Sequence, residues 1–453
     1  MTQSKPKKLN LIMLITLVCG NMIGSGVFLL PSDLAQFGTI SLLSWFFTAA
    51  GAILLALVFA DLSRKFPKTG GPYAYSRLGL GEFIGFQTAY QYWIALWVGN
   101  GAIAIAFVGY LRVFIPQLNN SVATCFTAIG LIWLLTAINI TGVRKAGVMQ
   151  IITTFLKLIP LIIIILFGWE YISFHNYFTN LNISSPHVSN FSAISTSATL
   201  TLWAFIGLES ATVPADSVEN PRRNIPLATI IGTLLAAAVY ILSSTIIMGM
   251  IPAPILKLST SPYADGAALI FGHWGRDLIA LGAIISCFGT LNGWVLVQGQ
   301  VAMAAAENKL FPNIFAKRNK ANVPQPALLI SAGLISLLLL LTISNNLVHQ
   351  FQTIILIATL ATLIPYLYTN ISSIILDLKE KDKSGIAWKP IIISFFAALF
   401  SCWAILSSGT DTMKYGAIVL ISTVPIYAWL RHRNSKSKSS EIAEIAESMM
   451  VND

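Results

Sequence analysis

Long apolar runs recur from one end of the chain to the other and constrain its fold more than any other feature of its 453 residues. A helix needs about 20 mostly apolar residues to cross the hydrocarbon core of a bilayer. Runs of this length predict an all-α polytopic membrane protein with twelve transmembrane helices. We place these helices at about 10–36, 40–60, 82–114, 121–141, 147–168, 192–215, 226–250, 275–305, 325–343, 350–377, 388–406 and 414–431.

The composition excludes the other common classes for a chain of this length. Only 10% of the residues are charged and 55% are hydrophobic, whereas a soluble protein carries about 25% charged residues. Too little charge is present to cover several water-facing domains. The net charge of +10 does not indicate nucleic-acid binding, because the basic residues stand singly or in pairs between apolar runs. The partner that this composition implies is membrane lipid.

The distribution of basic residues orients the helices. If the N-terminus is cytoplasmic, 23 of the 28 Lys and Arg residues fall in cytoplasmic segments, four fall outside and Lys157 lies within a span. Because Lys and Arg are retained on the cytoplasmic side during insertion, we expect both termini inside. The first run is longer than a signal-peptide core and lacks a small-residue cleavage site, so we expect it to be retained. Residues 1–9 and 432–453 are then cytoplasmic, the latter as a solvated tail without definite structure.

The cysteines and histidines do not indicate a metal site or a disulfide framework. All four cysteines lie within apolar runs, where a small buried hydrophobe is the usual role, and the five histidines lack the spacing of metal ligands. These residues are Cys19, Cys125, Cys287, Cys402, His175, His187, His273, His349 and His432. We predict no metal and no cofactor.

Two of the predicted helices contain glycine and polar residues at mid-span. These are the first, at 20–26 (GNMIGSG), and the sixth, at 203–210 (WAFIGLES). A glycine in a membrane helix is more often a packing contact than a break, but paired interruptions in two halves are typical of inverted repeats with a midplane binding site. An interrupted helix exposes N–H groups that suit a carboxylate and carbonyls that suit an ammonium. These are the two ends of an amino acid.

Two ionisable side chains, Glu209 and Lys157, lie deep within predicted spans. Such groups are functional candidates by default, although either could be a structural residue satisfied within the bundle. Trp203 and Trp294 also lie at mid-span rather than at the interfaces where Trp is enriched. Their ring faces can attract a cation, and core packing is the alternative. Asn100 could serve a ligand or tie two helices together.

Several longer motifs resemble those of one transporter superfamily. They are GNMIGSGVFLLP at 20–31, GGPYAY at 70–75, YW at 92–93 with WVGN at 97–100, WAFIGLES at 203–210, ENPRRNIP at 219–226, GW at 293–294 and PYLYT at 365–369. From about residue 10 to 430 the chain resembles the amino acid–polyamine–organocation superfamily, within it the basic amino acid/polyamine antiporters, and most closely the bacterial arginine/agmatine antiporters. The resemblance implies a transporter of the bacterial inner membrane rather than an enzyme.

The same resemblance implies an architecture and a transport cycle. The core would consist of two five-helix repeats in inverted orientation, at 10–168 and 192–377, with broken first and sixth helices. Two additional helices would follow within 388–431. Substrates would cross by alternating access, with one solute exchanged for another, and a homodimer is compatible with this family.

The resemblance also assigns a substrate site. The backbone at the first break would hold the substrate carboxylate, Trp203 and Ile206 would contact the α-amino end and the aliphatic stem, and Trp294 would stack on the cationic head. The complete set implied for substrate binding is Met22, Ile23, Gly24, Ser25, Gly26, Ala95, Leu96, Asn100, Trp203, Ile206, Trp294 and Ala358.

Gating and coupling residues follow from the same comparison. Tyr92, Glu209 and Trp294 resemble a proximal gate, and Tyr366 resembles a distal one. The residues implied for pH or ion coupling are Glu209, Lys157 and Tyr73. If Lys157 faces the interrupted first helix, its ammonium could bind carbonyls freed near Met22 and Ile23, in the place that sodium occupies in sodium-driven relatives.

The departures from the family pattern concern the substrate more than the fold. Leu96 and Ala358 replace a cysteine and a serine near the guanidinium in arginine/agmatine antiporters, and Asn292 replaces a glycine. Lys157 has no counterpart there but resembles a lysine of proton-coupled or uniport members of the superfamily.

We therefore expect a secondary transporter that exchanges a cationic amino acid for its decarboxylated amine. Arginine/agmatine comes first, in support of acid resistance, and ornithine/putrescine or lysine/cadaverine come next. The alternative within transport is proton-linked or uniport uptake of neutral or varied amino acids. A non-transporting membrane sensor is the alternative of another class.

Overall fold

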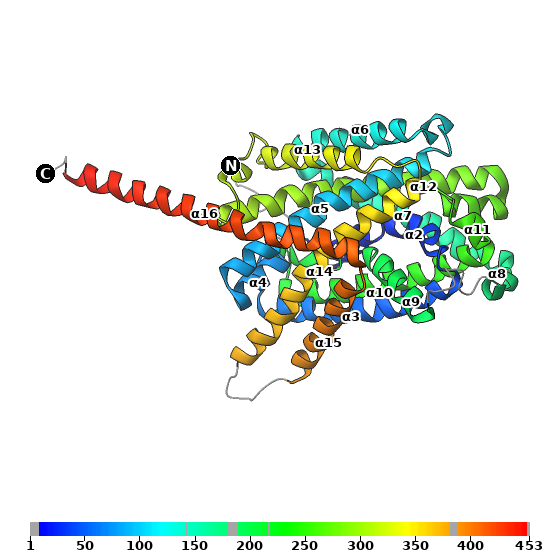
Figure 1. The fold of residues 1–453 in the computed structure, drawn as a ribbon, viewed down its shortest axis with the longest axis horizontal. Coiled ribbons are helices and arrows are strands. Elements are labelled where there is room, and N and C mark those ends of the chain that lie inside the picture. The colour runs from blue at the N-terminus through cyan, green and yellow to red at the C-terminus, as the bar shows by residue number, and fades with distance from the viewer. Residues whose placement is uncertain (1–8, 142, 180–188, 216–217, 381–387, 451–453) are drawn as a thin grey trace.

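The computed structural model describes residues 9–141, 143–179, 189–215, 218–380 and 388–450, and this part of the chain is almost entirely helical (Figure 1). The all-α membrane class is confirmed, because ten helices are long and apolar enough to cross a bilayer. They are Leu11–Leu34, Thr39–Lys65, Glu82–Leu111, Ser121–Ile140, Ile152–Tyr171, Pro221–Met250, Pro262–Glu307, Leu347–Lys379, Trp388–Leu406 and Thr412–Arg433. Each overlaps one of the predicted spans.

The two remaining predicted spans correspond to shorter helices. The span at 325–343 is α13 (Gln325–Leu341), which is apolar but has 17 residues and therefore rises about 25 Å. The span at 192–215 contains α9 (Asn190–Trp203), followed by turns and the 3-10 helix η4 (Ser210–Thr212). The helical path of this segment is therefore interrupted after Trp203.

The remaining elements follow the order expected from the apolar runs. They are α1 (Leu11–Met22), α2 (Ser25–Leu34), η1 (Thr39–Ser41), α3 (Leu42–Lys65), α4 (Pro72–Leu80), α5 (Glu82–Leu111), η2 (Pro116–Asn119), α6 (Ser121–Ile140), α7 (Val143–Phe167), η3 (Gly168–Tyr171), α8 (Phe174–Thr179), α10 (Pro221–Met250), α11 (Ala253–Leu256), α12 (Pro262–Glu307), η6 (Asn313–Ala316), α14 (Leu347–Lys379), α15 (Trp388–Leu406) and α16 (Thr410–Met450).

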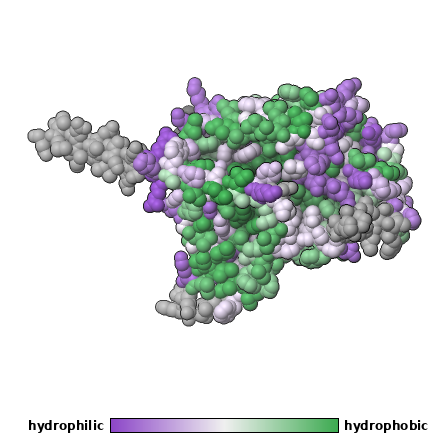
Figure 2. Space-filling model, viewed as in Figure 1, coloured by the Kyte–Doolittle hydropathy of each residue, from purple (hydrophilic) through white to green (hydrophobic). Residues whose placement is uncertain are grey.

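The helices pack side by side around α5. This helix packs against both α12 and α14, while α3 packs along α10, and α1 packs against α7 and α10. Figure 1 shows α6 and α13 together along one side of the bundle and α15 on another. The face in Figure 2 is mostly hydrophobic, with hydrophilic residues gathered toward the ends of the helices. An apolar surface over an apolar interior is what a helical bundle in lipid requires.

Three predictions from the sequence are corrected here. Helix α12 begins at Pro262 rather than near 275, and Gly272 (φ 67°) kinks it. Its first part was not predicted, because polar residues and the kink interrupt the apolar run there. Helix α16 continues to Met450 and projects from the bundle, where no definite structure was predicted. Its last residues are rich in Glu, Ala, Ile and Met, and Glu, Ala and Met favour a helix despite the charge. Cys402 is exposed, unlike the other cysteines, because α15 turns it toward the apolar surroundings.

Asp33 is a further buried ionisable residue within a span, beside the two predicted. Its side chain is fully buried near the end of α2, and neither carboxyl oxygen has a hydrogen-bond partner among the described residues. The sequence analysis did not single it out. The packing of α2 against α5, α9, α10, α12 and α14 covers it.

Candidate functional site

The first membrane helix is interrupted for two residues at its middle. Helix α1 ends at Met22, Ile23 and Gly24 take non-helical conformations, and α2 begins at Ser25. A helix end leaves carbonyls unpaired and a helix start leaves N–H groups unpaired. No side chain caps the start of α2. Both kinds of backbone group are thus available in the interior of the bundle.

Lys157 binds the carbonyls at this break. Its fully buried ammonium donates to the carbonyl oxygens of Gly20 at 2.6 Å and Ile23 at 2.9 Å, and to Oγ1 of Thr290 at 2.8 Å. Three donors therefore meet three acceptors, which is the full capacity of an ammonium. The structure places Lys157 at the break as expected, with Gly20 rather than Met22 as the second carbonyl.

The second interruption lies directly against the first. After α9 the chain turns through Gly207, whose φ of 114° favours glycine. A Cβ atom at Gly207 would lie 3.2 Å from atoms of both Asn21 and Trp294. The Asn21 amide also donates to Oγ of Ser210 at 2.9 Å, and the Trp294 indole N–H donates to the Asn21 carbonyl at 3.2 Å. The absence of a side chain at Gly207 thus lets the two breaks meet.

Glu209 joins the second break to two long helices. Its carboxylate accepts hydrogen bonds from the hydroxyls of Tyr92 at 2.6 Å and Tyr366 at 2.5 Å, and from the backbone N–H of Gly207 at 3.1 Å. Tyr92 lies on α5 and Tyr366 on α14, and all three side chains are buried. Tyr92 of the implied proximal gate and Tyr366 of the implied distal gate therefore both bind the Glu209 carboxylate. Trp294, the other residue of the proximal gate, does not.

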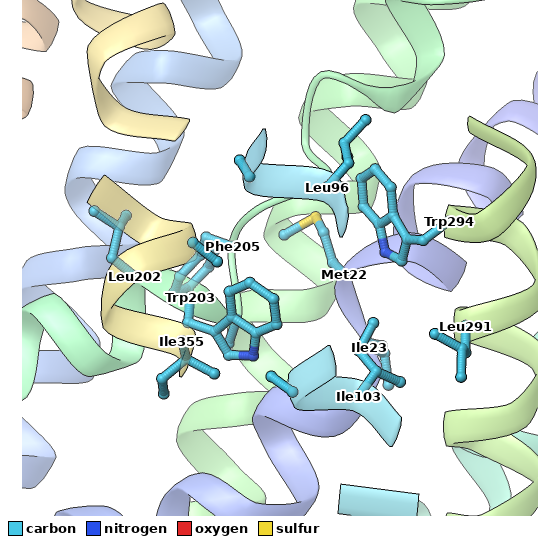
Figure 3. Close-up of a cluster of buried hydrophobic side chains, with 14 of the residues drawn as sticks. Met22, Ile23, Leu96, Ile103, Leu202, Trp203, Phe205, Leu291, Trp294 and Ile355 are labelled. Carbon is cyan, nitrogen blue, oxygen red and sulfur yellow. The ribbon is translucent and has the colours of Figure 1, made fainter. Parts of the chain in front are cut away.

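A cavity lies between the two breaks and α5. Its lining consists of Asn21, Met22, Gly24, Ser25, Gly26, Ala95, Leu96, Gly99, Asn100, Ile103, Trp203, Ile206, Thr290, Trp294 and Thr362. Figure 3 shows Met22 between the two indole rings, with Leu96 and Ile103 on either side. The space enclosed is about 30 Å³, enough for one or two water molecules. An amino acid could enter only after these side chains move.

The cavity includes ten of the twelve residues implied for substrate binding. Ile23 and Ala358 do not line it: the Ile23 carbonyl binds Lys157, and the side chain of Ala358 lies close to Gly99, 3.8 Å from where a Cβ atom of that residue would be. Asn292 also lies off the cavity, where it accepts a hydrogen bond from Asn139 at 2.9 Å. The replacements at 292 and 358 therefore do not alter the cavity wall directly.

Trp203 owes its position to two glycines. A Cβ atom at Gly99 would lie 2.6 Å from Cη2 of the indole, and one at Gly26 would lie 3.2 Å from Cδ1. The ring is therefore held between α2 and α5 with one face toward the cavity. Gly99 was visible in the sequence only as part of the WVGN motif, without a role.

Two residues that line the cavity carry unpaired polar atoms. The Asn100 amide donates to Oε1 of Gln298 at 2.7 Å, but its own Oδ1 has no partner among the described residues, and the same holds for Oγ of Ser25. Thr290 and Thr362, which the sequence did not single out, also line the cavity, but their hydroxyls are paired, with Lys157 and with the Ala358 carbonyl respectively. Threonine is common in membrane helices, so only packing distinguishes these two.

Tyr73 lies apart from the cavity, on α4. Its hydroxyl accepts a hydrogen bond from the Asn308 amide at 3.0 Å, and Asn308 in turn accepts one from Arg77 at 3.0 Å. Burial raises the pKa of the Tyr73 phenol. This hydroxyl therefore stays protonated throughout the acidic and neutral range, and a pH role would have to act through its hydrogen bonds.

We expect Glu209→Gln to flatten the pH dependence of transport while preserving substrate binding. A glutamine cannot titrate, and it replaces one charged acceptor with a donor, so a charge-assisted hydrogen bond worth about 1.5–3 kcal/mol is lost. Initial rates measured from pH 5 to 8 test this. Tyr92→Phe and Tyr366→Phe each remove one donor and are the controls, because both keep the carboxylate. An unaltered pH profile in Glu209→Gln would place proton handling elsewhere.

Comparison with known proteins shows one family over nearly the whole chain. The model of the amino acid permease family matches residues 9–429. The putrescine transporter PotE of Escherichia coli (strain K12) is 35% identical over 434 residues, which is 96% of this chain and 98% of the relative. PotE of Haemophilus influenzae is 34% identical, with 95% and 98% covered. The cadaverine/lysine antiporter of E. coli (strain K12) is 33% identical, with 98% and 100% covered.

Proposed function

Because this chain belongs to the amino acid permease family, we propose that it exchanges a cationic amino acid for its decarboxylated amine by alternating access. The named substrates of its relatives are putrescine, cadaverine and lysine. We therefore rank ornithine/putrescine and lysine/cadaverine above arginine/agmatine, which reverses the order suggested by the sequence motifs.

The observation that carries this proposal is the cavity between the two interrupted helices. The uncapped start of α2 offers N–H groups and a positive dipole end to a carboxylate. Trp203 and Trp294 offer ring faces to a cation, and the unpaired Oδ1 of Asn100 offers it an acceptor. An amine without a carboxylate would use only the groups that bind a cation, namely the two ring faces and the Asn100 oxygen. The amino acid and its amine can therefore occupy the same site.

The lining also favours a primary ammonium over a guanidinium. An ammonium has three donors, whereas the planar guanidinium has five that require several acceptors in one plane. Leu96 contributes an apolar wall to the cavity where arginine/agmatine antiporters have a cysteine. The remaining acceptors are single oxygens on separate helices, which suit the smaller cation.

The transport cycle that we propose rests on two inverted five-helix repeats. The first comprises α1/α2, α3, α5, α6 and α7, and the second comprises α9, α10, α12, α13 and α14, with α15 and α16 outside the core. With twelve spans in all, both termini are cytoplasmic. The broken members, α1/α2 and α9, meet at the cavity, as expected for a site at a repeat interface.

One observation favours a second function. Lys157 occupies the carbonyls of the first break, where a fixed cation could couple the site to protons. Proton-linked or uniport uptake of neutral or varied amino acids is therefore the alternative.

Counterflow in proteoliposomes tests the proposal. Vesicles loaded with unlabelled ornithine, lysine, arginine, leucine or buffer receive external labelled putrescine, and initial uptake is compared. We expect ornithine or lysine loading to stimulate uptake at least about tenfold over buffer and over leucine. Equal uptake of putrescine into every vesicle would contradict exchange. Uptake of labelled leucine into buffer-loaded vesicles, driven by a pH gradient, would support the alternative.

A further inference from the structure

A groove separate from the substrate cavity opens between α3, α10 and α15. Its walls are apolar, with Leu57 on α3, Ile230 on α10 and Ile393 on α15, and its volume is about 240 Å³. Charged residues stand at one end only, where Arg64 and Lys389 line it. These are the ends of α3 and α15 that the count of basic residues assigns to the cytoplasmic side.

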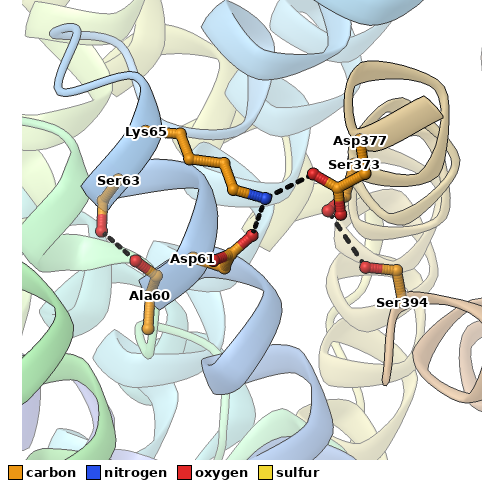
Figure 4. A network of polar contacts seen from close by, with 7 residues as sticks. All are labelled: Ala60, Asp61, Ser63, Lys65, Ser373, Asp377 and Ser394. Atoms are coloured by element: carbon orange, nitrogen blue, oxygen red, sulfur yellow. Dashed lines mark hydrogen bonds and ion pairs between the residues drawn. The ribbon is translucent and has the colours of Figure 1, made fainter. Parts of the chain in front are cut away.

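The acidic residue in the groove is already paired. Asp61 forms an ion pair with Lys65 at 2.6 Å, and the same ammonium lies 2.5 Å from Asp377 on α14 (Figure 4). Arg64 and Lys389, in contrast, are exposed and form no ion pair with any residue that the structure describes. Two cations are therefore left to face whatever fills the groove.

The start of α15 adds to this positive end. The structure describes α15 from Trp388 onward, so Lys389 lies toward the N-terminal end of this helix, where the helix dipole is positive. A phosphate group is a usual ligand for basic side chains at such a place. The apolar walls continue from it along the lipid-facing side of three helices.

We propose that this groove binds one anionic phospholipid of the cytoplasmic leaflet. Arg64 and Lys389 contact its phosphate, and an acyl chain lies along Leu57, Ile230 and Ile393. Free phosphate would satisfy the cations but leave the apolar walls uncovered, whereas a zwitterionic lipid would bring a choline or ethanolamine cation toward Arg64 and Lys389. The charge and the walls together select an anionic lipid.

The lipid would hold α15 against α3. Helix α15 is hydrogen-bonded to α14 at two places: Ser394 donates to Ser373 at 3.0 Å (Figure 4), and the Asn370 amide donates to Ser401 at 3.2 Å. Helix α3 reaches α14 through Lys65, but among the described residues it has no hydrogen bond to α15, against which it packs through Phe47 with Phe400 and Trp403. A phosphate held by both Arg64 and Lys389 would add a polar link to this packing.

Lipid retention measured by native mass spectrometry tests this assignment. Purified protein is titrated with 1-palmitoyl-2-oleoyl-phosphatidylglycerol or with the matching phosphatidylcholine. We expect one tightly held phosphatidylglycerol in the wild type, and about thirty-fold weaker retention in Arg64→Gln/Lys389→Gln, because each basic residue near an anionic surface contributes about a factor of five. Lys317→Gln/Lys320→Gln is the control, because it removes the same charge from exposed residues of a loop assigned to the same side.

Three results would overturn the proposal. They are equal retention of the two lipids by the wild type, an equal loss in the control variant, and complete displacement of the lipid by millimolar inorganic phosphate. The wild-type comparison of lipids needs no variant, so poor folding of a variant does not affect it. Retention needs no transport activity, so this result is independent of the proposed function.

Discussion

Trp294→Leu is expected to weaken binding of putrescine or ornithine by about ten- to thirty-fold. The Trp294 ring forms one wall of the cavity, 6% exposed and fixed by its hydrogen bond to the Asn21 carbonyl. A cation over an indole face in a desolvated site gains up to about 2 kcal/mol, and each 1.4 kcal/mol is a factor of ten in affinity. Leucine keeps an apolar wall but lacks the ring. Substrate-dependent protection against thermal unfolding measures the affinity.

The control for this variant is a tryptophan outside the cavity. Trp133→Leu changes a partly exposed residue of α6 and should leave affinity unchanged. Binding of a neutral analogue to Trp294→Leu should fall much less than that of the cation. If both ligands lose affinity equally, Trp294 shapes the cavity without recognising charge.

Lys157→Met is expected to reduce exchange by about a hundredfold or more. Methionine has a similar length but no donor, so the carbonyls of Gly20 and Ile23 are left buried without their partner. Each unsatisfied group costs about 1–3 kcal/mol, and the cost falls on the break that forms the substrate site. Exchange rates in proteoliposomes, with folding checked by size-exclusion chromatography, measure this. Lys257→Met, at an exposed position, is the matched control.

The same contact predicts that transport needs no sodium. The ammonium of Lys157 already occupies the acceptors at the first break, and a sodium ion there would face an adjacent positive charge. Replacing sodium with choline should leave the wild-type rate unchanged. Stimulation by sodium, or a Lys157→Met protein with normal flux at every pH, would remove Lys157 from the coupling mechanism.

The sequence was sufficient for the features that depend on composition and local pattern. Apolar runs fixed the membrane class and ten spans, and the GNMIGSG run marked the first break, because both are properties of consecutive residues. The rarity of charge at depth drew attention to Lys157 and Glu209. Their partners could not be read from the sequence, since Lys157 reaches Thr290 across 133 positions and Tyr366 reaches Glu209 across 157.

The features that could not be predicted from the sequence all depend on how the helices pack against one another. Asp33 was not identified as a buried ionisable residue, because only the packing around α2 shows that it is buried. Thr362 lines the cavity, whereas Ala358, one turn earlier on α14, does not. In a helix that is apolar on every side, the sequence pattern cannot tell these two positions apart. The ion pairs of Lys65 with Asp61 and Asp377 likewise require α3 and α14 to be neighbours.

The charge moved in each cycle tests the exchange most directly. Ornithine carries a net charge of about +1 and putrescine about +2 at neutral pH, because the carboxylate is ionised and the amines are mostly protonated at that pH. Proteoliposomes loaded with putrescine on a solid-supported membrane are therefore given external ornithine. Exchange of one for the other predicts a transient current of positive charge leaving the vesicles, reversed when the two solutes are swapped and absent with putrescine on both sides. Release of labelled putrescine without any current, or at the same rate without external ornithine, would contradict the account.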